Sequence, residues 1–238
     1  MSVLKVHINE AGYKTNEIVI KDIKFEIKPG ELVGLLGPNG AGKSTTIKGL
    51  IGTLEYINGT IEFDQDERRY AYIPEQPVFY DDLTMWEHFQ FTASVCGMTD
   101  SEMEKRVGEL LKIFRLGEVK HHLPRTFSKG MQQKLMIILA FLVRPSLYII
   151  DEPFVGLDPR AIRDFLKLLE AERENGASVL MSTHVLDTAE RICDRFLLIA
   201  YGEMIANGDM KELQEMLNLP DAALFDCFEQ LLEDNDHD

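Results

Sequence analysis

A glycine-rich stretch between an apolar strand and a helix constrains this chain more than any other feature. It reads Gly37-Pro38-Asn39-Gly40-Ala41-Gly42-Lys43-Ser44-Thr45, the G-x-x-x-x-G-K-[ST] pattern of a Walker A motif. Glycine lets the backbone curl so that successive N–H groups point at phosphate oxygens, and the positive end of the next helix faces the same anion. Lys43 can reach the outer phosphates of a nucleotide, and the Ser44 hydroxyl can bind Mg²⁺. The apolar run 31–36 and the helical residues 45–50 predict an α/β fold around this loop.

Length and charge limit the classes of function that remain. The chain has 238 residues, enough for one large domain or two small ones, and a formal net charge of −15. This acidic excess disfavours broad contact with nucleic acid, so a nucleotide site must be positive only locally. Three cysteines without metal-like spacing suggest a reducing compartment. We therefore expect a cytoplasmic protein with no nucleic-acid partner.

No segment of the sequence has the pattern of a secretion signal or a membrane span. Residues 1–7 lack the apolar core of a signal peptide. The longest apolar run, residues 135–143, is far shorter than a bilayer requires. We expect that the chain does not cross a membrane by itself.

The first third of the chain predicts strands. Alternating apolar and polar residues indicate antiparallel strands over residues 2–9 and 18–27, with Tyr13 in the turn between them. An aromatic ring there could stack on adenine, but a surface tyrosine in a turn is an equally good interpretation. Residues 59–63 and 70–73 predict two more strands, joined by a charged turn over residues 64–69.

The middle of the chain predicts helices. From residue 85 to about residue 123 apolar residues recur at helical spacing without strand signals, and Ser128 is a natural N-cap for the next helix. The expected organisation has three parts. They are an α/β core with an N-terminal antiparallel β subdomain (residues 1–83 and 145–218), a helical subdomain (84–144) and an acidic C-terminal helix and tail (219–238).

A second motif carries acidic groups. A continuous apolar strand over residues 147–150 ends in Asp151-Glu152-Pro153, the Walker B pattern. Asp151 can hold Mg²⁺ through water at the carboxyl end of the strand. Glu152 points elsewhere and can polarise the water that attacks the phosphate.

His184 follows a further apolar strand, residues 178–182, at its carboxyl end. Ligands of α/β sheets bind at this edge. The imidazole could donate to the γ-phosphate and orient the attacking water, which makes His184 a candidate catalytic residue.

Together and in this order, the motifs resemble the ATP-binding subunit of an ABC transporter. The resemblance covers about residues 1–218. Besides the motifs above, it rests on the stretches Phe127-Ser128-Lys129-Gly130-Met131 and Gly156-Leu157-Asp158. Residues 72–80, 127–134 and 180–184 are similar to the Ecs-type ATP-binding proteins of Gram-positive bacteria. The resemblance implies a P-loop NTPase (RecA-like) core of the ABC type, ATP and Mg²⁺ as ligands, and hydrolysis of ATP to ADP and phosphate, with Lys43, Glu152 and His184 as catalytic residues.

The resemblance also implies an assembly. In that family two ATP-binding subunits form a head-to-tail dimer with two ATP molecules between them. Ser128 and Gly130 would contact the ATP of the partner copy, Asp158 would lie at the dimer seam, and Tyr13 would contact adenine. A second copy or a homologous subunit and a membrane-spanning permease would be the partners, with the chain peripheral on the inner face of the cell membrane.

Two positions depart from the family pattern. Lys129 and Met131 stand in the signature L-S-G-G-Q, where the family has a glycine and the glutamine. Counting back from residues 83–84 places the family's metal-contacting glutamine at Glu75, whose carboxylate adds negative charge beside the triphosphate. Gln76 is the alternative ligand if the loop is shifted by one residue.

Two other functions compete with a transporter subunit. One is a soluble ABC-type ATPase that drives assembly or remodelling of a complex outside the membrane. DNA-maintenance ATPases carry a long coiled coil between Walker A and the signature, and that interval has no sustained heptads here, but an assembly ATPase is harder to exclude. The other is an adaptor that binds ATP without turnover, which Glu152 and His184 disfavour.

Overall fold

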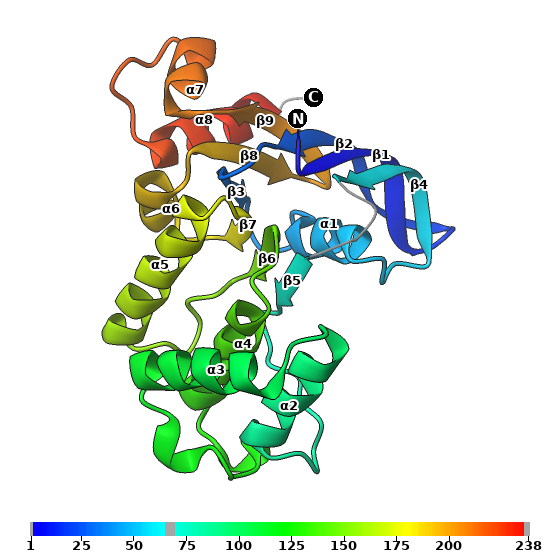
Figure 1. The fold of residues 1–238 in the computed structure, drawn as a ribbon. Coiled ribbons are helices and arrows are strands. Elements are labelled where there is room, and N and C mark those ends of the chain that lie inside the picture. Colours follow the sequence, from blue (N-terminus) through cyan, green and yellow to red (C-terminus); the bar gives the residue numbers. More distant parts are fainter. Residues whose placement is uncertain (1, 65–69, 236–238) are drawn as a thin grey trace. The chain divides into compact units, whose positions relative to one another are not determined.

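The computed structural model describes residues 2–64 and 70–235, and the chain divides into two compact units. The described part of the first unit is residues 2–64 and 178–235, and that of the second is residues 70–177 (Figure 1). The predicted boundaries after residues 83, 144 and 218 stay predictions. The predicted charged turn, apart from residue 64, and the last three residues of the predicted tail lie outside the described residues.

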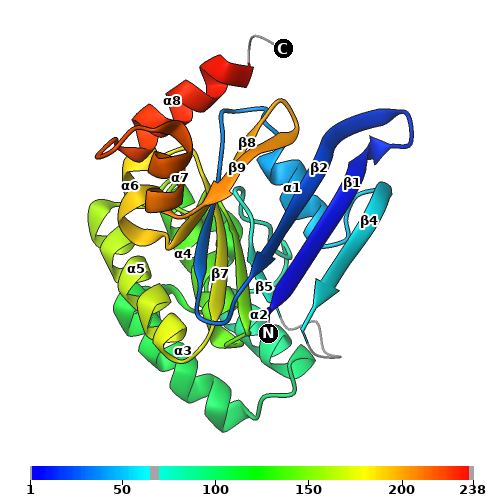
Figure 2. The same cartoon turned by 90° about the horizontal axis from the view of Figure 1, so that it is seen from above.

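The first unit is built on a mixed sheet with the strand order β4-β1-β2-β9-β8-β3-β7. The strands are β1 Leu4–Lys14, β2 Glu17–Ile27, β3 Leu32–Leu36, β4 Tyr56–Phe63, β7 Ser178–Thr183, β8 Arg195–Ala200 and β9 Glu203–Gly208. β1, β2 and β4 form an antiparallel ribbon, seen side by side in Figure 2, whereas β3 pairs in parallel with β7 and β8. The predicted antiparallel strands are therefore confirmed, and β3 and β7 are buried along their whole length.

The prediction that Tyr13 lies in a turn is wrong, because β1 continues to Lys14. Gly12 makes this possible. A Cβ at Gly12 would lie 1.9 Å from the carbonyl oxygen of Glu17, so no other residue fits where the two strands approach. The turn therefore falls on residues 15 and 16, and Tyr13 is held by the pairing of β1 with β2.

The helices of the first unit pack on this sheet. They are α1 Lys43–Leu50, α6 Leu186–Ile192, α7 Met210–Leu217 and α8 Leu224–Asn235. α1 contacts β1 and β2, and its Ile47 is fully buried with Ile8 and Ile20 of those strands. α6, α7 and α8 share a buried cluster with Phe196 and Leu198 of β8. Leu224, Phe228 and Leu231 form the buried face of α8, and the side chain of Phe225 next to them is half exposed.

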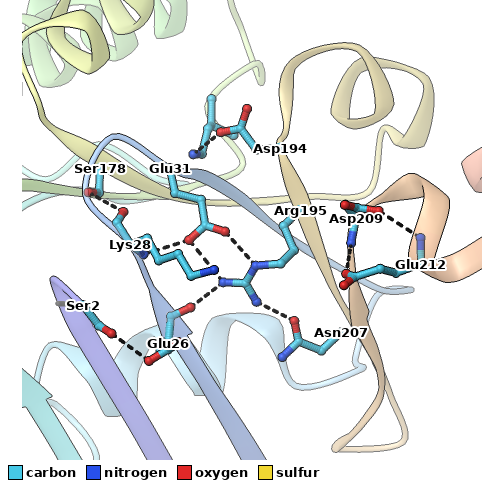
Figure 3. Close-up of polar contacts among 11 residues, drawn as sticks. Ser2, Glu26, Lys28, Glu31, Ser178, Asp194, Arg195, Asn207, Asp209 and Glu212 are labelled. Atoms are coloured by element: carbon cyan, nitrogen blue, oxygen red, sulfur yellow. Dashed lines mark hydrogen bonds and ion pairs between the residues drawn. The ribbon is translucent and has the colours of Figure 1, made fainter.

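Arg195, the first residue of β8, joins the antiparallel ribbon to the parallel strands (Figure 3). Its Nε donates to Glu31 Oε1 at 2.7 Å, and its other nitrogens donate to the carbonyl oxygen of Glu26 and to Asn207 Oδ1. The side chains of Arg195 and Glu31 are only 15% and 12% exposed. One guanidinium thus links β2, the residue before β3, and β9.

The second unit has two parallel paired strands and a set of helices (Figure 1). The elements are β5 Tyr70–Ile73, α2 Met85–Val95, α3 Asp100–Phe114, short 3₁₀ turns at Gly117–Val119 and Pro124–Thr126, α4 Lys129–Leu142, β6 Leu147–Asp151 and α5 Pro159–Glu174. The predicted helices between residues 85 and 143 are confirmed.

Capping side chains start the helices of the second unit. Thr84 and Thr99 form capping boxes, and Ser128 and Asp158 accept from the first turns of α4 and α5. Aromatic contacts hold α4 on the fully buried strand β6. Phe141 stacks on Tyr148 with ring centroids 4.6 Å apart.

Candidate functional site

The phosphate loop curls around its own lysine. Gly40 and Gly42 have φ angles of 85° and 108°, which only glycine adopts without strain. Lys43 is almost fully buried, and its Nζ donates to the carbonyl oxygens of Gly37 at 2.7 Å and Pro38 at 3.1 Å. A Cβ at Gly37 would lie 2.2 Å from the carbonyl oxygen of Ile199, so the loop is packed against β8. A buried ammonium inside a glycine cradle fits a bound phosphate.

A hairpin turn braces this loop from behind. The N–H of Gly202, between β8 and β9, donates to the carbonyl oxygen of Ala41 at 3.0 Å, and its own carbonyl oxygen accepts from the N–H of Lys21 at 2.8 Å. Gly202 has a φ of 81°, and a Cβ there would lie 2.2 Å from the carbonyl oxygen of Val19. Gly202 and Ala41 are far apart in the sequence, so no local pattern indicates this contact with the phosphate loop.

Tyr13 meets the helix that follows the phosphate loop. Its Oη lies 3.2 Å from Nζ of Lys48, and its side chain remains 42% exposed. The pKa of Tyr13 is lowered, first by a hydrogen bond with the Thr45 hydroxyl and then by the one with Lys48. The structure therefore brings Tyr13 to Thr45 of the Walker A motif, while its contact with adenine stays a prediction.

His184 lies at the same edge of the sheet as the phosphate loop. β7 pairs with β3 so that Thr183 is opposite Leu36, and the residues after these two strands are His184 and Gly37. The hydroxyl of Thr183 accepts from the N–H of Val185 at 3.1 Å and turns the chain there. His184 is exposed, so its imidazole is accessible to a ligand at this edge of the sheet.

The Walker B carboxylates lie in the second unit. Asp151 and Glu152 are both buried, and Glu152 has a φ of 47° directly before a proline, a strained conformation for a residue with a side chain. Burial, and then the negative charges of Asp151 and Glu75, raise the pKa of Tyr72 on β5 to about 12. The charges of Asp151 and Glu75 thus both act on Tyr72. Glu75 and Gln76 are both exposed, and which of the two would contact the metal ion stays open.

The start of α4 and Asp158 also come together in the second unit. The Ser128 hydroxyl accepts from the N–H of Met131 at 3.3 Å, and a Cβ at Gly130 would lie 2.7 Å from the carbonyl oxygen of Gly156. Lys134 Nζ donates to Asp158 Oδ2 at 2.9 Å. This bond and the N–H of Ala161 lower the pKa of Asp158 to about 2.

The Lys134–Asp158 contact was not predicted. The two residues are 24 positions apart, and no local pattern connects them. The first unit thus gathers Tyr13, the phosphate loop and His184. The second unit gathers Glu75 with the Walker B carboxylates, and Ser128 and Gly130 with Asp158.

Comparison with known proteins bears directly on these motifs. A family model described as "ABC transporter" matches residues 20–155. Two ATP-binding proteins of Bacillus subtilis (strain 168) are similar over nearly the whole chain. The ABC transporter ATP-binding protein YthP is 49% identical, with 95% of each chain covered, and the ABC-type transporter ATP-binding protein EcsA is 47% identical, with 99% of this chain and 98% of EcsA covered.

Solved structures agree with the fold. A structure described as the ATP-binding subunit of an ABC transporter has a TM-score of 0.93 and 42% identity, covering 97% of this chain and all of that one. CbiO1 from Clostridium perfringens, described as part of the ABC transporter complex cbiONQ, has a TM-score of 0.72 and 27% identity, with 92% and 95% covered. The predicted P-loop ABC-type fold is confirmed. Across residues 2–64 and 70–235, no helix is long and apolar enough to cross a membrane.

Proposed function

The chain belongs to the family of ABC transporter ATP-binding subunits, and on this premise we propose that it hydrolyses ATP in a head-to-tail dimer to drive a separate membrane-spanning permease. The observation that carries the proposal is the buried Lys43 ammonium, held at 2.7 Å by the carbonyl oxygen of Gly37 inside the glycine cradle. A triphosphate entering this loop would replace the neutral carbonyl oxygens as acceptors with negatively charged phosphate oxygens, which bind an ammonium more strongly.

The described residues offer the donors that Mg²⁺ prefers. The Ser44 hydroxyl is in the first turn of α1, and the Asp151 carboxylate ends β6, with Glu75 or Gln76 as a further oxygen donor. Mg²⁺ in nucleotide sites takes one or two protein oxygens together with phosphate oxygens and water. When bound, the ion supplies neutralisation of negative charge on the phosphates.

Three side chains would serve the hydrolytic step. Lys43 neutralises charge on the outer phosphates, and Glu152 accepts a hydrogen bond from the attacking water and polarises it. His184, at the edge of the sheet next to the phosphate loop, donates to the γ-phosphate and orients that water. The left-handed backbone of Glu152 supports this role, because strain of this kind gathers at functional sites.

Dimerisation would complete each ATP site. Ser128 caps α4, so the positive end of a fourteen-residue helix is available to a γ-phosphate held by the partner copy. Gly130 and Lys134 hold the loop with Asp158 against that helix end, which supports placing Asp158 at the same seam. ATP would then shift the population toward the closed dimer, and hydrolysis would release it.

An exposed apolar surface of the second unit suits a membrane partner. Val78, Tyr80, Phe91 and Val95 are all at least 48% exposed. The ring of Tyr80 meets that of Phe91 edge-on at 5.4 Å, and the N–H of Tyr80 donates to Nε2 of the buried His88 at 3.0 Å. An exposed apolar surface of this kind fits a short helix of a permease, which would hold the chain on the inner face of the cell membrane.

Glu152→Gln tests the enzymatic part of the proposal. It removes the charge that polarises water and keeps the side chain's size, so hydrolysis should fall by roughly 10²–10⁴ while ATP binding is retained. Glu229→Gln, on the exposed face of α8, is the matched control and should hydrolyse ATP normally. Turnover that survives in Glu152→Gln would show that Glu152 is not the catalytic carboxylate.

A pull-down separates the transporter from an assembly ATPase. Tagged Glu152→Gln protein with ATP and Mg²⁺ should recover a polytopic membrane protein in stoichiometric amount from detergent-solubilised native membranes. If only proteins without membrane spans are recovered, the ATPase chemistry stands, but it drives assembly or remodelling instead of transport.

A further inference from the structure

Lys48 contacts Tyr13, the aromatic residue that the family resemblance predicts to contact the adenine of ATP. Lys48 lies one helical turn after Ser44 on α1. Its Nζ is 3.2 Å from Oη of Tyr13 and 5.0 Å from the centroid of the Tyr13 ring, so the ammonium reaches both the hydroxyl and one face of the ring.

The Tyr13 hydroxyl also forms a hydrogen bond with a residue of the Walker A motif. Thr45, directly after Ser44, hydrogen-bonds Oη of Tyr13 and is itself buried. The ring of Tyr13 is therefore held by two side chains of the helix whose first turn faces the triphosphate. Lys48 and Thr45 meet Tyr13 at its hydroxyl end and the side chain is 42% exposed, so part of the ring stays open to a planar ligand.

The two ends of the nucleotide site are thus joined by short contacts inside the first unit. β1 carries Tyr13, and β2 is tied to the phosphate loop by the Gly202 turn, whose N–H and carbonyl oxygen bridge Ala41 and Lys21. Lys48 and Thr45 provide a second connection, because both contact Tyr13 itself. Together, the Gly202 turn and these two side chains fix the separation between the Tyr13 ring and the phosphate loop.

We propose that Lys48 is a positioning residue for the nucleobase. It holds the partly exposed Tyr13 ring in a fixed position beside α1, so that a nucleotide whose base contacts this ring places its phosphates in the loop. The inference rests on the proposed function, since it requires that the loop and Tyr13 bind the same nucleotide. Lys48 acts through Tyr13 and not on the phosphates.

Binding measurements on the full chain with two probes test this inference. Lys48→Met keeps the apolar stem and removes the ammonium, and Tyr13→Phe keeps the ring and removes the hydroxyl. Each variant should weaken the affinity for ATP about three- to tenfold and leave the affinity for inorganic tripolyphosphate within about twofold, because tripolyphosphate has no base. Lys48→Arg, which keeps a cation and donors, should restore most of the ATP affinity.

The double variant provides the decisive comparison. If Lys48 acts through Tyr13, Lys48→Met with Tyr13→Phe binds ATP no worse than the weaker of the single variants. Effects that multiply would show that the two residues act separately and would overturn the inference. An equal loss of tripolyphosphate affinity would also overturn it, because Lys48 would then be one more phosphate-binding charge.

Controls separate this inference from the proposed function. Lys5→Met removes one exposed positive charge from β1 and should change neither affinity. Wild-type protein that fails to bind ATP would refute the proposed function itself. Wild-type binding together with an unchanged Lys48→Met would refute only the role of Lys48. If Lys48→Met is unstable, Tyr13→Phe tests the same contact by removing a single oxygen.

Discussion

At the scale of single residues, glycines decide how the phosphate loop is supported. Gly202 and Gly52 both have left-handed backbones, with φ angles of 81° and 75°. A Cβ at Gly52 would meet nothing within 4 Å, whereas one at Gly202 would collide with the carbonyl oxygen of Val19 at 2.2 Å. A substitution at Gly52 therefore measures the effect of backbone strain alone, whereas one at Gly202 adds the effect of a displaced turn.

Gly202→Ala should harm both stability and nucleotide binding. A left-handed alanine costs about 1–2 kcal/mol, and the collision with Val19 adds to it and moves the turn away from Ala41. We expect a larger fall in the free energy of unfolding than in Gly52→Ala and a several-fold rise in the KM for ATP. Urea unfolding and ATPase assays measure these. Equal effects of both substitutions would show that the turn does not brace the loop.

At the scale of elements, the ion pair of Arg195 and Glu31 ties strands that share few backbone bonds. β2 meets β9 at Lys21 and Glu203, so side chains must hold this junction (Figure 3). Burial by itself would raise the pKa of Glu31, but hydrogen bonds from Arg195 and from the N–H of Lys28 outweigh it and keep the pKa below its ordinary value. The folded state therefore favours the charged carboxylate.

Glu31→Gln should lower the free energy of unfolding by about 2–3 kcal/mol at neutral pH, because it leaves the shielded guanidinium without its anion. The unfolded chain takes up the proton near pH 4, before the folded chain does. The contribution of Glu31 is thus complete above that pH and is lost as the pH falls through the lower folded pKa. Urea unfolding at pH 7 and pH 3 should show the variant's deficit shrinking in acid. If Glu31→Gln lost the same free energy of unfolding at pH 7 and at pH 3, the lowered pKa of Glu31 in the folded state would be contradicted.

The apolar surface of the second unit, which includes Tyr80 and Phe91, leads to a separate prediction. Tyr80→Lys places a charge where Tyr80 meets Phe91 and leaves the phosphate loop and the Walker B residues unchanged. Recovery of the membrane partner in the pull-down should fall at least tenfold, while hydrolysis by the purified chain stays within about twofold. Ser101→Lys, at an exposed residue of α3, shows whether any added charge on this unit has that effect. Equal loss of partner binding and hydrolysis in Tyr80→Lys would refute a docking role.

At the scale of the whole molecule, net charge opposes the proposed dimer. Each copy carries a formal charge of −15, so two copies repel one another at low ionic strength. Raising the salt from about 0.01 M to about 0.1 M shortens the screening length from ~30 Å to ~10 Å. The dimer fraction of Glu152→Gln at saturating ATP should therefore rise over this range. Sedimentation measures it, with ADP as the control, and a fall with salt would show that opposite charges dominate the interface.

Much of the fold follows from local chemistry and is predictable. Walker A and Walker B are read from residues that are neighbours in the chain. Helix starts at Ser128, Asp158 and Asp209 follow from side chains that cap N–H groups three residues away. Continuous apolar runs predicted the buried strands β6 and β7, because such strands are covered on both faces.

The sequence by itself therefore determined the order of the elements, the family and the candidate residues. Only the tertiary structure decided how those residues are held. It placed Lys48 on Tyr13, Gly202 on Ala41 and Lys134 on Asp158. It also placed Tyr13 in a strand and not in the predicted turn. Each of these contacts joins residues 24 or more positions apart, and their meeting depends on strand register and on which helix face packs, which spacing along the chain does not encode.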